Sequence, residues 1–260
     1  MNNPSDELSF WGHLDELRAV IIKISIATVI FGVLAFLFKE QVYAVILAPK
    51  EWDFITYRVL HNISNTLTGQ DSPLEKFSVE LINTALAGQF VVHMKTSIYI
   101  GAISVLPYIL YLLFQFISPA LYATERRVTF RIVTSSYLMF MAGVALTYFV
   151  IFPLTFKFLG TYQVSDSVSN SITLQSYLGA FSMLSLAMGC VFEIPILSWL
   201  LAKFGVINAT MMRQFRRHVI VVLLIIAAII TPTTDIFTLL IVSLPMYLLY
   251  EASILLVKKR

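Results

Sequence analysis

Charged residues and cysteine are scarce in this chain. Only 13% of its 260 residues are charged and 58% are hydrophobic, whereas soluble domains average about a quarter charged. The single cysteine, Cys190, excludes an internal disulfide framework, and we expect it to be a small buried apolar residue. The net charge of +3 gives no reason to expect a nucleic-acid partner. This composition predicts a polytopic membrane protein.

Motifs of common enzymes are also missing. The sequence contains no HExxH, no GxSxG and no phosphate-binding loop, and its four histidines are not spaced to hold a metal. We therefore expect a protein without catalytic activity, metal or cofactor. The first ten residues, MNNPSDELSF, are polar and acidic, unlike the basic start of a cleavable signal peptide. We expect the first apolar segment to direct its own insertion.

Apolar segments long enough to cross a bilayer recur along the chain. About 20 apolar residues cover the ~30 Å hydrocarbon core, which predicts spans over residues 19–38, 97–117, 132–152, 177–202 and 236–257. We expect Pro153 to end the third of these helices. Residues 219–230 form a shorter run, which is either a short fifth span or part of a re-entrant pair. We favour the span, so the sequence predicts an all-α protein with six transmembrane helices.

Basic residues set the expected orientation. With both termini in the cytoplasm, 12 of the 18 Lys and Arg residues fall in cytoplasmic segments, and the other 6 are spread over longer outer loops. The positive-inside rule favours this arrangement. Residues 1–260 then form one transmembrane domain, with cytoplasmic segments 1–18, 118–131 and 203–218 and extracytoplasmic loops 39–96 and 153–176. Two stretches of the first loop, 42–60 and 74–90, look amphipathic, and we expect them to cover the outer surface.

Two acidic motifs lie on the predicted cytoplasmic side. The first, FWGHLDELR, occupies residues 10–18 and runs into the first span. Read as a helix, it has an apolar face, and Asp15 and Glu16 fall on other faces. Acidic residues contribute little to topology, so we expect this pair to bind a cationic partner. The second motif, SPALYATERR at residues 118–127, contains Glu125 beside two arginines. Taken alone, it could be a solvated loop with an internal ion pair.

Five motifs in order resemble one known family. After the two acidic motifs come YFVIFP at 148–153, FEIP at 192–195 and TPTTD at 231–235. This series resembles TatC, the core receptor subunit of the twin-arginine protein translocase, over about residues 8–251. The resemblance implies a concave, glove-like set of six helices in the bacterial plasma (inner) membrane, with both termini cytoplasmic. It also implies binding of Arg-Arg signal peptides of folded cargo. Transport would use single-span partners of the TatA and TatB type, in a larger oligomeric complex driven by the proton-motive force.

By motif match, Glu16 and Glu125 are the two carboxylates that bind the arginine pair. The chemistry agrees, because a guanidinium binds a carboxylate through two parallel hydrogen bonds, and two arginines need two carboxylates. The other signal-peptide-binding residues implied by the two motifs are His13, Leu14, Arg18, Phe116, Pro119, Leu121 and Arg126.

One carboxylate lies inside a predicted span. An ionisable group at the position of Glu193 costs at least ~2.5–3.5 kcal/mol on insertion scales. It either faces the hollow of the glove and contacts a translocating chain or partner, or it is a neutral, hydrogen-bonded buried carboxyl. Glu193 also motivates an alternative function, a proton-coupled transporter of small molecules. That alternative predicts internal repeats, which the sequence lacks.

The TPTTD motif precedes the last span. The resemblance implies that this region, including Thr231 and Asp235, binds partner helices, whereas Asp235 could equally cap the last helix. Many family members carry glutamine four residues after the aspartate, and this chain has Leu239. A polar contact to a partner would then have to come from Thr231, Thr234 or Thr238.

Three further residues have structural expectations. Pro49 and Pro153 lie where the outer loops of the family begin, so we expect them to shape a rigid cap. Glu251 lies near the predicted cytoplasmic end of the last span, where we expect it to pair with a basic neighbour.

Overall fold

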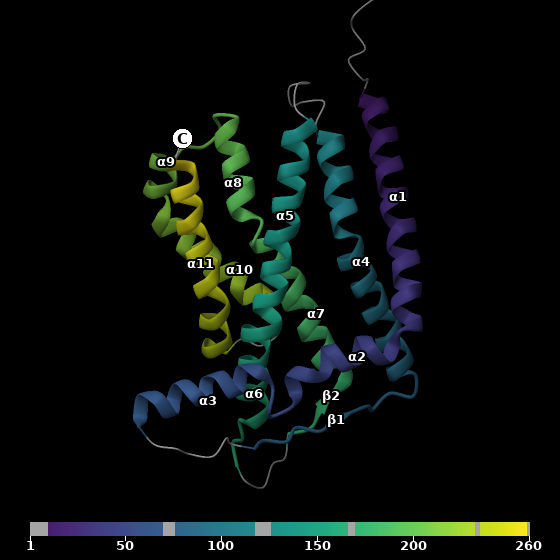
Figure 1. The fold of residues 1–260 in the computed structure, drawn as a ribbon, viewed down its shortest axis with the longest axis vertical. Coiled ribbons are helices and arrows are strands. Elements are labelled where there is room, and N and C mark those ends of the chain that lie inside the picture. Colours follow the sequence, from purple (N-terminus) through teal and green to yellow (C-terminus); the bar gives the residue numbers. More distant parts are fainter. Residues whose placement is uncertain (1–9, 70–75, 118–125, 166–169, 232–234, 259–260) are drawn as a thin grey trace, which may run out of the picture. The chain divides into compact units, whose positions relative to one another are not determined.

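The structure is a computed structural model, described for residues 10–69, 76–117, 126–165, 170–231 and 235–258 (Figure 1). It is almost entirely helical, which confirms the all-α fold class. In these residues five helical segments are long and apolar enough to cross a membrane: Leu14–Leu37, Gly88–Leu113, Phe130–Thr161, Leu174–Lys203 and Ile236–Val257. They contain or overlap the five long spans that hydropathy predicts. The short fifth span and the orientation of the termini stay predictions.

The chain divides into two compact units, formed by residues 1–39 with 93–137 and by residues 40–92 with 138–260. The smaller unit contains α1 (Phe10–Leu37), most of α4 (Gly88–Ile117) and the first part of α5 (Arg126–Leu146). Each unit is described below by itself.

In the smaller unit, α1 and α4 run antiparallel and meet at two glycines. A Cβ added to Gly101 would lie 2.6 Å from the backbone nitrogen of Gly32 and 2.7 Å from the carbonyl oxygen of Thr28. Nearer the end of α1, the ring of Phe36 stacks on His93 of α4 with 3.9 Å between ring centroids. These two contacts fix the register of one helix against the other.

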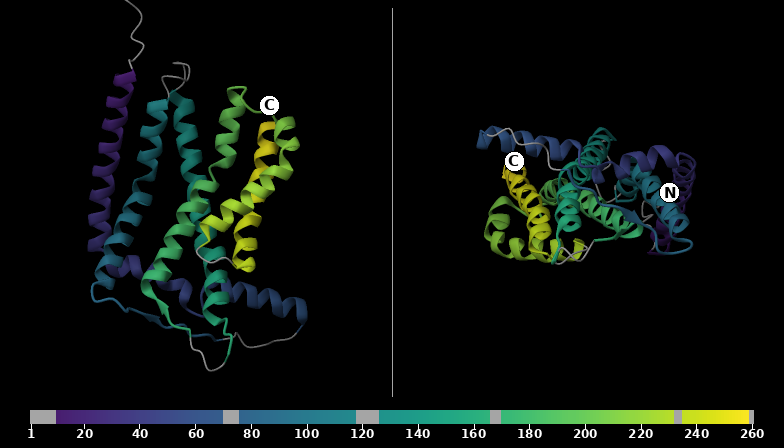
Figure 2. Two further views of the ribbon diagram at one scale, coloured as in Figure 1. Left: turned by 180° about the vertical axis from the view of Figure 1, so that it is seen from behind. Right: turned by 90° about the horizontal axis from the view of Figure 1, so that it is seen from below.

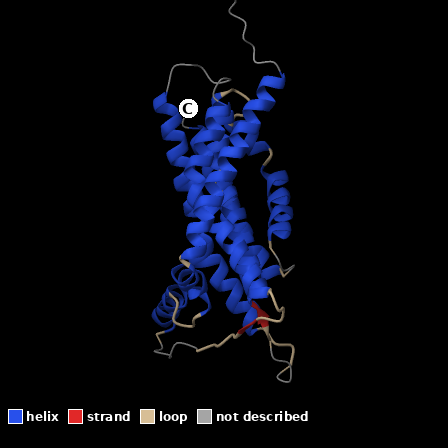
Figure 3. Ribbon diagram, turned by 90° about the vertical axis from the view of Figure 1, so that its right-hand side faces the viewer, coloured by secondary structure: helices blue, strands red, loops and turns tan. Residues whose placement is uncertain are grey.

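The larger unit contains the remaining elements. They are almost all of α2 (Lys39–Leu47), η1 (Ala48–Lys50), α3 (Ile55–Thr68), β1 (Leu81–Ile82), the end of α5, η3 (Thr147–Ile151), α6 (Phe152–Thr161), β2 (Ile172–Thr173), α7 (Leu174–Val191), α8 (Ile194–Lys203), α9 (Ala209–Gln214), α10 (Arg216–Ile230) and α11 (Ile236–Lys258). The strands β1 and β2, red in Figure 3, pair in parallel, with Leu81 opposite Ile172. The pair joins the two loops that the sequence predicts to be extracytoplasmic.

Pro153 does not end the third span, and that prediction is wrong. The helix continues from α5 through the π-helical turn η3 and through α6 to Thr161. Proline has no amide hydrogen to donate to the preceding turn. The wider turn accommodates this loss, since the amide of Phe152 donates to the carbonyl of Thr147. The hydroxyl of Thr56 in α3 also donates to the carbonyl of Phe149. The helix therefore continues beyond Pro153 with the help of a hydrogen bond from outside the helix.

The fourth predicted span is interrupted. Helix α7 ends at Val191 and α8 begins at Ile194, with Pro195 in its first turn. At the junction the amide of Phe192 donates to the carbonyl of Met188 at 2.9 Å, and the amide of Glu193 donates to that of Cys190 at 3.1 Å. The expectation that Cys190 is buried is wrong, because its side chain is exposed on α7. In a membrane helix an apolar side chain can face outward, since lipid tails are as apolar as a protein core.

The core of the larger unit forms where α5 and α7 approach closely. A Cβ on Gly143 would lie 2.6 Å from the carbonyl oxygen of Met188, and one on Gly189 would lie 2.6 Å from the ring of Phe140. Leu184 and Met188 are fully buried beside this contact. Helices α8 and α10 pack along α11 on another side of the unit.

The two amphipathic stretches have different structures. Residues 42–60 fall within α2, η1 and α3, with a break between α2 and α3. The described part of residues 74–90 has no helix before Gly88 and includes β1. Helix α3 runs crosswise to α6 and α11, as the views in Figures 1 and 2 agree.

Candidate functional site

The first acidic motif forms the beginning of α1. Glu16 is half-buried, whereas Asp15 and Arg18 are exposed. Leu14 is 41% exposed and precedes Asp15 and Glu16 in the chain, so its apolar side chain lies on a different face of α1 from that of Glu16. His13 lies in the same helix, and its side chain is outside the described part of the structure.

The second motif is described only at its edges. Phe116 lies in the last turn of α4 and is half-buried, and Arg126 is the first residue of α5. Pro119, Leu121 and Glu125 lie outside the described residues, as does the side chain of Arg126. The structure therefore places one of the two candidate carboxylates, Glu16, and leaves the distance between the pair as a prediction.

The register of α1 against α4 places Glu16 relative to this motif. Glu16 lies 16 residues before Gly32, and Ile117 lies 16 residues after Gly101. The two glycines meet in an antiparallel contact, and an α-helix rises 1.5 Å per residue. Both residues are thus ~24 Å along their helices from the crossing, in the same direction. Glu16 is therefore level with the end of α4, where the chain enters the segment that contains Glu125.

Of the TPTTD motif the structure describes Thr231, which follows α10, and Asp235, which precedes α11. The Asp235 carboxylate accepts a hydrogen bond of 2.7 Å from the amide of Thr238 and so caps the first turn of α11. Thr231 is buried at the end of α10, and its hydroxyl donates to the carbonyl of Ala228 at 3.4 Å. The side chain of Thr238 is fully buried.

Leu239 and Thr234 are the other two candidate residues of this region. Leu239 is half-buried, and Thr234 lies outside the described residues. Capping by Asp235, one of the two roles considered for it, is thus part of the structure, and Thr231 and Thr238 are directed into the protein.

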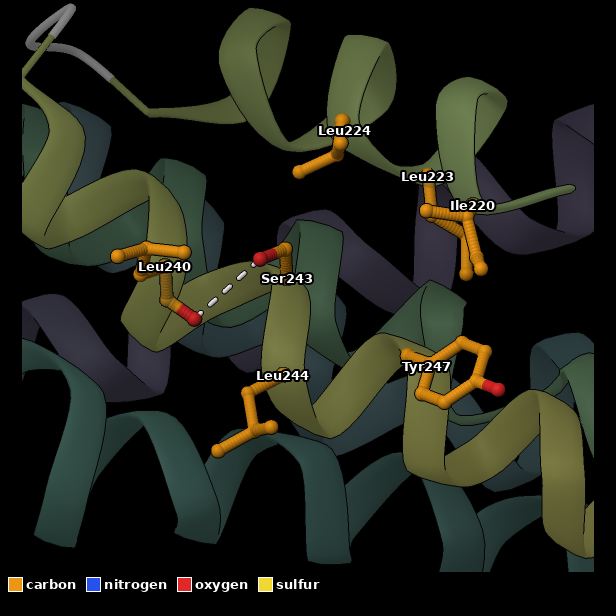
Figure 4. A pocket seen from close by; sticks show the side chains of 7 residues that line it. All are labelled: Ile220, Leu223, Leu224, Leu240, Ser243, Leu244 and Tyr247. Carbon is orange, nitrogen blue, oxygen red and sulfur yellow. Dashed lines mark hydrogen bonds between the residues drawn. The ribbon is translucent and has the colours of Figure 1, made fainter. Parts of the chain in front are cut away.

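An apolar groove lies between α10 and α11 and was not found by sequence reasoning (Figure 4). Its volume is about 380 Å³, and its lining residues are Ile220, Leu223, Leu224, Leu240, Ser243, Leu244 and Tyr247. The hydroxyl of Ser243 is turned back onto its own helix, where it donates to the carbonyl of Leu240 at 3.3 Å. The sequence signal for the groove is that α10 and α11 are both apolar on the faces they turn to each other.

A polar cluster adjoins the groove at Tyr247, which belongs to both. Arg216 donates to one carboxylate oxygen of Glu251 at 2.6 Å, and Tyr247 donates to the other at 3.0 Å. The expectation that Glu251 pairs with a basic neighbour is confirmed. Tyr250, one helical turn after Tyr247 in α11, donates its hydroxyl to the carbonyl of Met212 in α9 at 2.7 Å. The cluster fastens the start of α10 and the end of α9 to the last helix.

Glu193 is the residue that precedes α8. Its side chain is half-buried, and its backbone carbonyl accepts a hydrogen bond of 2.9 Å from the amide of Leu197. The carboxylate thus lies at the break between two helical halves of one predicted span. Its two interpretations, contact with a partner and a neutral buried carboxyl, stay predictions.

The two prolines expected in the cap are linked by one tyrosine. Pro49 and Pro153 are both fully buried. The hydroxyl of Tyr57 lies 3.0 Å from the carbonyl oxygen of Pro49 and 2.9 Å from that of Pro153. Burial raises the pKa of Tyr57, so the hydroxyl stays protonated and available as a donor.

Two more tyrosines act on the same short segment. Tyr148 donates to the carbonyl of Val45 at 2.8 Å, and Tyr177 donates to that of Ile46 at 3.0 Å. The last carbonyls of a helix have no partner within it, so side chains or water must satisfy them. Here hydroxyls from η3 and α7 supply these bonds at the end of α2. Sequence reasoning missed this arrangement, because the donors are distant in the chain.

Comparisons with known proteins cover almost the whole chain. The sequence model of the family described as TatC, Sec-independent protein translocase protein, matches residues 12–245. A protein of this name from Blattabacterium sp. is 32% identical over 257 residues, covering 98% of this chain and 96% of that one. The one from Aquifex aeolicus is 32% identical over 247 residues, with 95% and 93% covered.

Solved structures give the same result. A crystal structure described as the twin arginine translocase receptor TatC superposes with a TM-score of 0.73 at 33% identity, covering 95% of this chain and 98% of that one. A second TatC crystal structure, in DDM, gives a TM-score of 0.74 at 32% identity, with 94% and 99% covered.

Proposed function

Since the chain belongs to the TatC family of Sec-independent protein translocase proteins, we propose that it is the core receptor of a twin-arginine translocase. In this role it binds the Arg-Arg pair of signal peptides on folded cargo at the cytoplasmic face of the bacterial inner membrane. As a translocase component, it works in a complex with other subunits.

The observation that carries the proposal is the position of Glu16 along α1 relative to the end of α4. It lies beside the end of α4, at the position where the motif containing Glu125 begins. If Glu125 lies near this end of α4, the two carboxylates suit two neighbouring guanidinium groups. Each charge-assisted pair could contribute about 1.5–3 kcal/mol to binding. The exposed Leu14 adds an apolar contact for the signal peptide.

The partner helices have a plausible binding surface in the larger unit. We propose that single-span subunits of the TatA and TatB type contact α10 and α11, where the apolar groove opens. A transmembrane helix presents apolar side chains that match this lining, and Thr231 and Asp235 form hydrogen bonds at the end of α10 and the start of α11. Transport is then driven by the proton-motive force.

Two observations count against a small-molecule transporter that uses Glu193. The family match, over residues 12–245, covers the second acidic motif and most of the first, and a small-molecule transporter would leave both motifs unexplained. Glu193 lies at a helix junction with Pro195 in the next turn, a position that accounts for a break in the span without a carrier site.

Binding of a twin-arginine signal peptide to the membrane-embedded protein tests the proposal. We expect Glu16→Ala, Glu125→Ala and the double variant to lose most of the binding. Glu193→Ala, which removes a carboxylate outside both acidic motifs, is the control and should bind the peptide like the wild type. If a correctly inserted double variant bound the peptide unchanged, the two-carboxylate site would be wrong.

A further inference from the structure

Helix α3 carries a row of exposed apolar side chains that no described residue covers. It is 14 residues long and lies outside the candidate spans. Val59 is 49% exposed, Leu60 44%, Ile63 51% and Leu67 81%. We call these four residues the α3 apolar row. Exposed apolar rows of this kind are uncommon in water and mark a surface that contacts a partner or a membrane.

The direction of the row follows from the first turn of α3. At 100° per residue, the row occupies an arc about 100° wide, and Thr56 falls within that arc. The hydroxyl of Thr56 donates to the carbonyl of Phe149, which belongs to the span Phe130–Thr161. Tyr57, which points to a different side of α3, is buried against Pro49 and Pro153. The apolar row is thus on the side of α3 that meets the lateral surface of a span.

The span surface at this point is itself apolar and exposed. Phe149 is 45% exposed and Val150 is 39% exposed. Phe54, which immediately precedes α3, stacks on Phe149 with ring centroids 6.2 Å apart and ring planes 12° apart. In a membrane protein such outward apolar residues of a span contact acyl chains. The α3 apolar row therefore continues a surface that faces lipid.

Charge on α3 favours lipid over a charged protein partner. From residue 59 to the end of the helix there is no Asp, Glu, Lys or Arg. Arg58, the only charged residue of the helix, pairs with Asp53 at 2.8 Å. The other polar side chains of α3 are amides, such as the exposed Asn62, hydroxyls and the imidazole of His61. A helix with a strong apolar face and a neutral polar face suits the interface of a bilayer without a requirement for anionic lipids.

We propose that α3 is an interfacial membrane anchor. It lies along the bilayer surface at the Pro153 end of the span, with the apolar row among the acyl chains and the polar face among the headgroups. Its length of ~21 Å widens the contact of the larger unit with that leaflet. The occupant of the apolar row is phospholipid.

Fluorescence quenching of the full chain in phospholipid vesicles tests the proposal. Single labelling sites are introduced by Ile63→Cys and Leu67→Cys in a Cys190→Ala background. The matched control is Asn62→Cys, which adjoins the row on the polar face. We expect labels at 63 and 67 to lose most of their fluorescence with lipids that carry a quencher on the acyl chain, and to be protected from aqueous iodide. The label at 62 should show the reverse.

Two results would overturn the proposal. One is equal quenching by iodide at all three sites, which would place α3 in water. The other is protection of 63 and 67 from both quenchers, which would mean that protein covers the row. The pattern should be the same in vesicles of neutral phosphatidylcholine and in vesicles with anionic lipid, and a requirement for anionic lipid would contradict the neutral anchor.

A second measurement needs no substitution. The wild-type chain in vesicles that contain a lipid with a photoreactive acyl chain should become labelled in the peptide that covers residues 59–67. The buried side chain of Tyr177 serves as the internal control, and we expect no label on that residue. Absence of label from residues 59–67, with the exposed span residues labelled, would contradict an anchor.

Discussion

Gly101 of α4 lies against Gly32 of α1 so closely that a Cβ on Gly101 would be 2.6 Å from the Gly32 nitrogen. Any larger side chain at Gly101 would have to push the two backbones apart, because the neighbouring atoms belong to the main chain. This contact also sets the level of Glu16 relative to the end of α4, so it links packing inside the smaller unit to the proposed binding site.

The first prediction concerns this glycine. Gly101→Ala should lower the free energy of unfolding by about 1–3 kcal/mol, the usual cost of overpacking. It should also weaken signal-peptide binding, because Glu16 shifts relative to α4. Gly179→Ala is the control, since a Cβ there would have no neighbour within 4 Å. Thermal unfolding in detergent and peptide affinity measure the two effects, and equal behaviour of the two variants would contradict the close contact.

A second prediction concerns the tyrosine that joins the two cap prolines. Tyr57→Phe removes the hydroxyl that donates to the carbonyls of Pro49 and Pro153. Because these carbonyls are left buried without that donor, we expect a loss of about 1–3 kcal/mol in the free energy of unfolding. Tyr162→Phe, at a side chain that is 62% exposed, should change it little. A melting temperature of Tyr57→Phe equal to that of the wild type would show that the bridge is unimportant.

Arg216 and Glu251 give a third prediction. Their side chains are 45% and 28% exposed, so solvent screens the pair, and we expect a coupling free energy of at most about 1 kcal/mol. A double-mutant cycle with Arg216→Gln and Glu251→Gln measures it through thermal unfolding. The more exposed pair Arg58 and Asp53, at 61% and 48%, is the comparison and should show less coupling. A coupling free energy of zero between Arg216 and Glu251 would show that this pair does not hold the start of α10 against α11.

The fourth prediction concerns the ligand. A signal peptide with Lys-Lys in place of Arg-Arg should bind the wild-type chain more weakly, because an ammonium group cannot form the two parallel hydrogen bonds of a guanidinium. The loss should shrink in Glu16→Ala, where one carboxylate is already missing. Equal affinity for both peptides, measured on the membrane-embedded protein, would rule out paired recognition by Glu16 and Glu125.

Sequence reasoning was reliable where the cause is local. Runs of apolar residues predicted the five long helical segments, because a helix satisfies its own backbone in lipid and needs only length and apolarity. The pairing of Glu251 followed from its place near a basic segment. Asp235 has the cap geometry that a residue of its type favours before a helix.

Features that depend on long-range contacts were not predicted correctly from the sequence. Pro153 suggests a helix end by itself, but the helix continues beyond it through the π-helical turn and a hydrogen bond from Thr56, which lies 93 residues before its acceptor Phe149. Cys190 was expected to be buried because the rules for soluble proteins were applied to a helix that can turn apolar groups outward. The second carboxylate of the candidate site, Glu125, lies outside the described residues, so its role rests on the family and on chemistry.

The parallel pairing of β1 with β2 has a consequence for biosynthesis. Leu81 pairs with Ile172, and Tyr177 donates to Ile46 across 131 residues of sequence. While the ribosome is still making residues before 172, the first loop has no partner for β1 and no donor from α7 for the end of α2. The loops can thus lock together only after more than half of the chain has been synthesised. A nascent chain stalled before that point would hold its early spans without the lock between its loops.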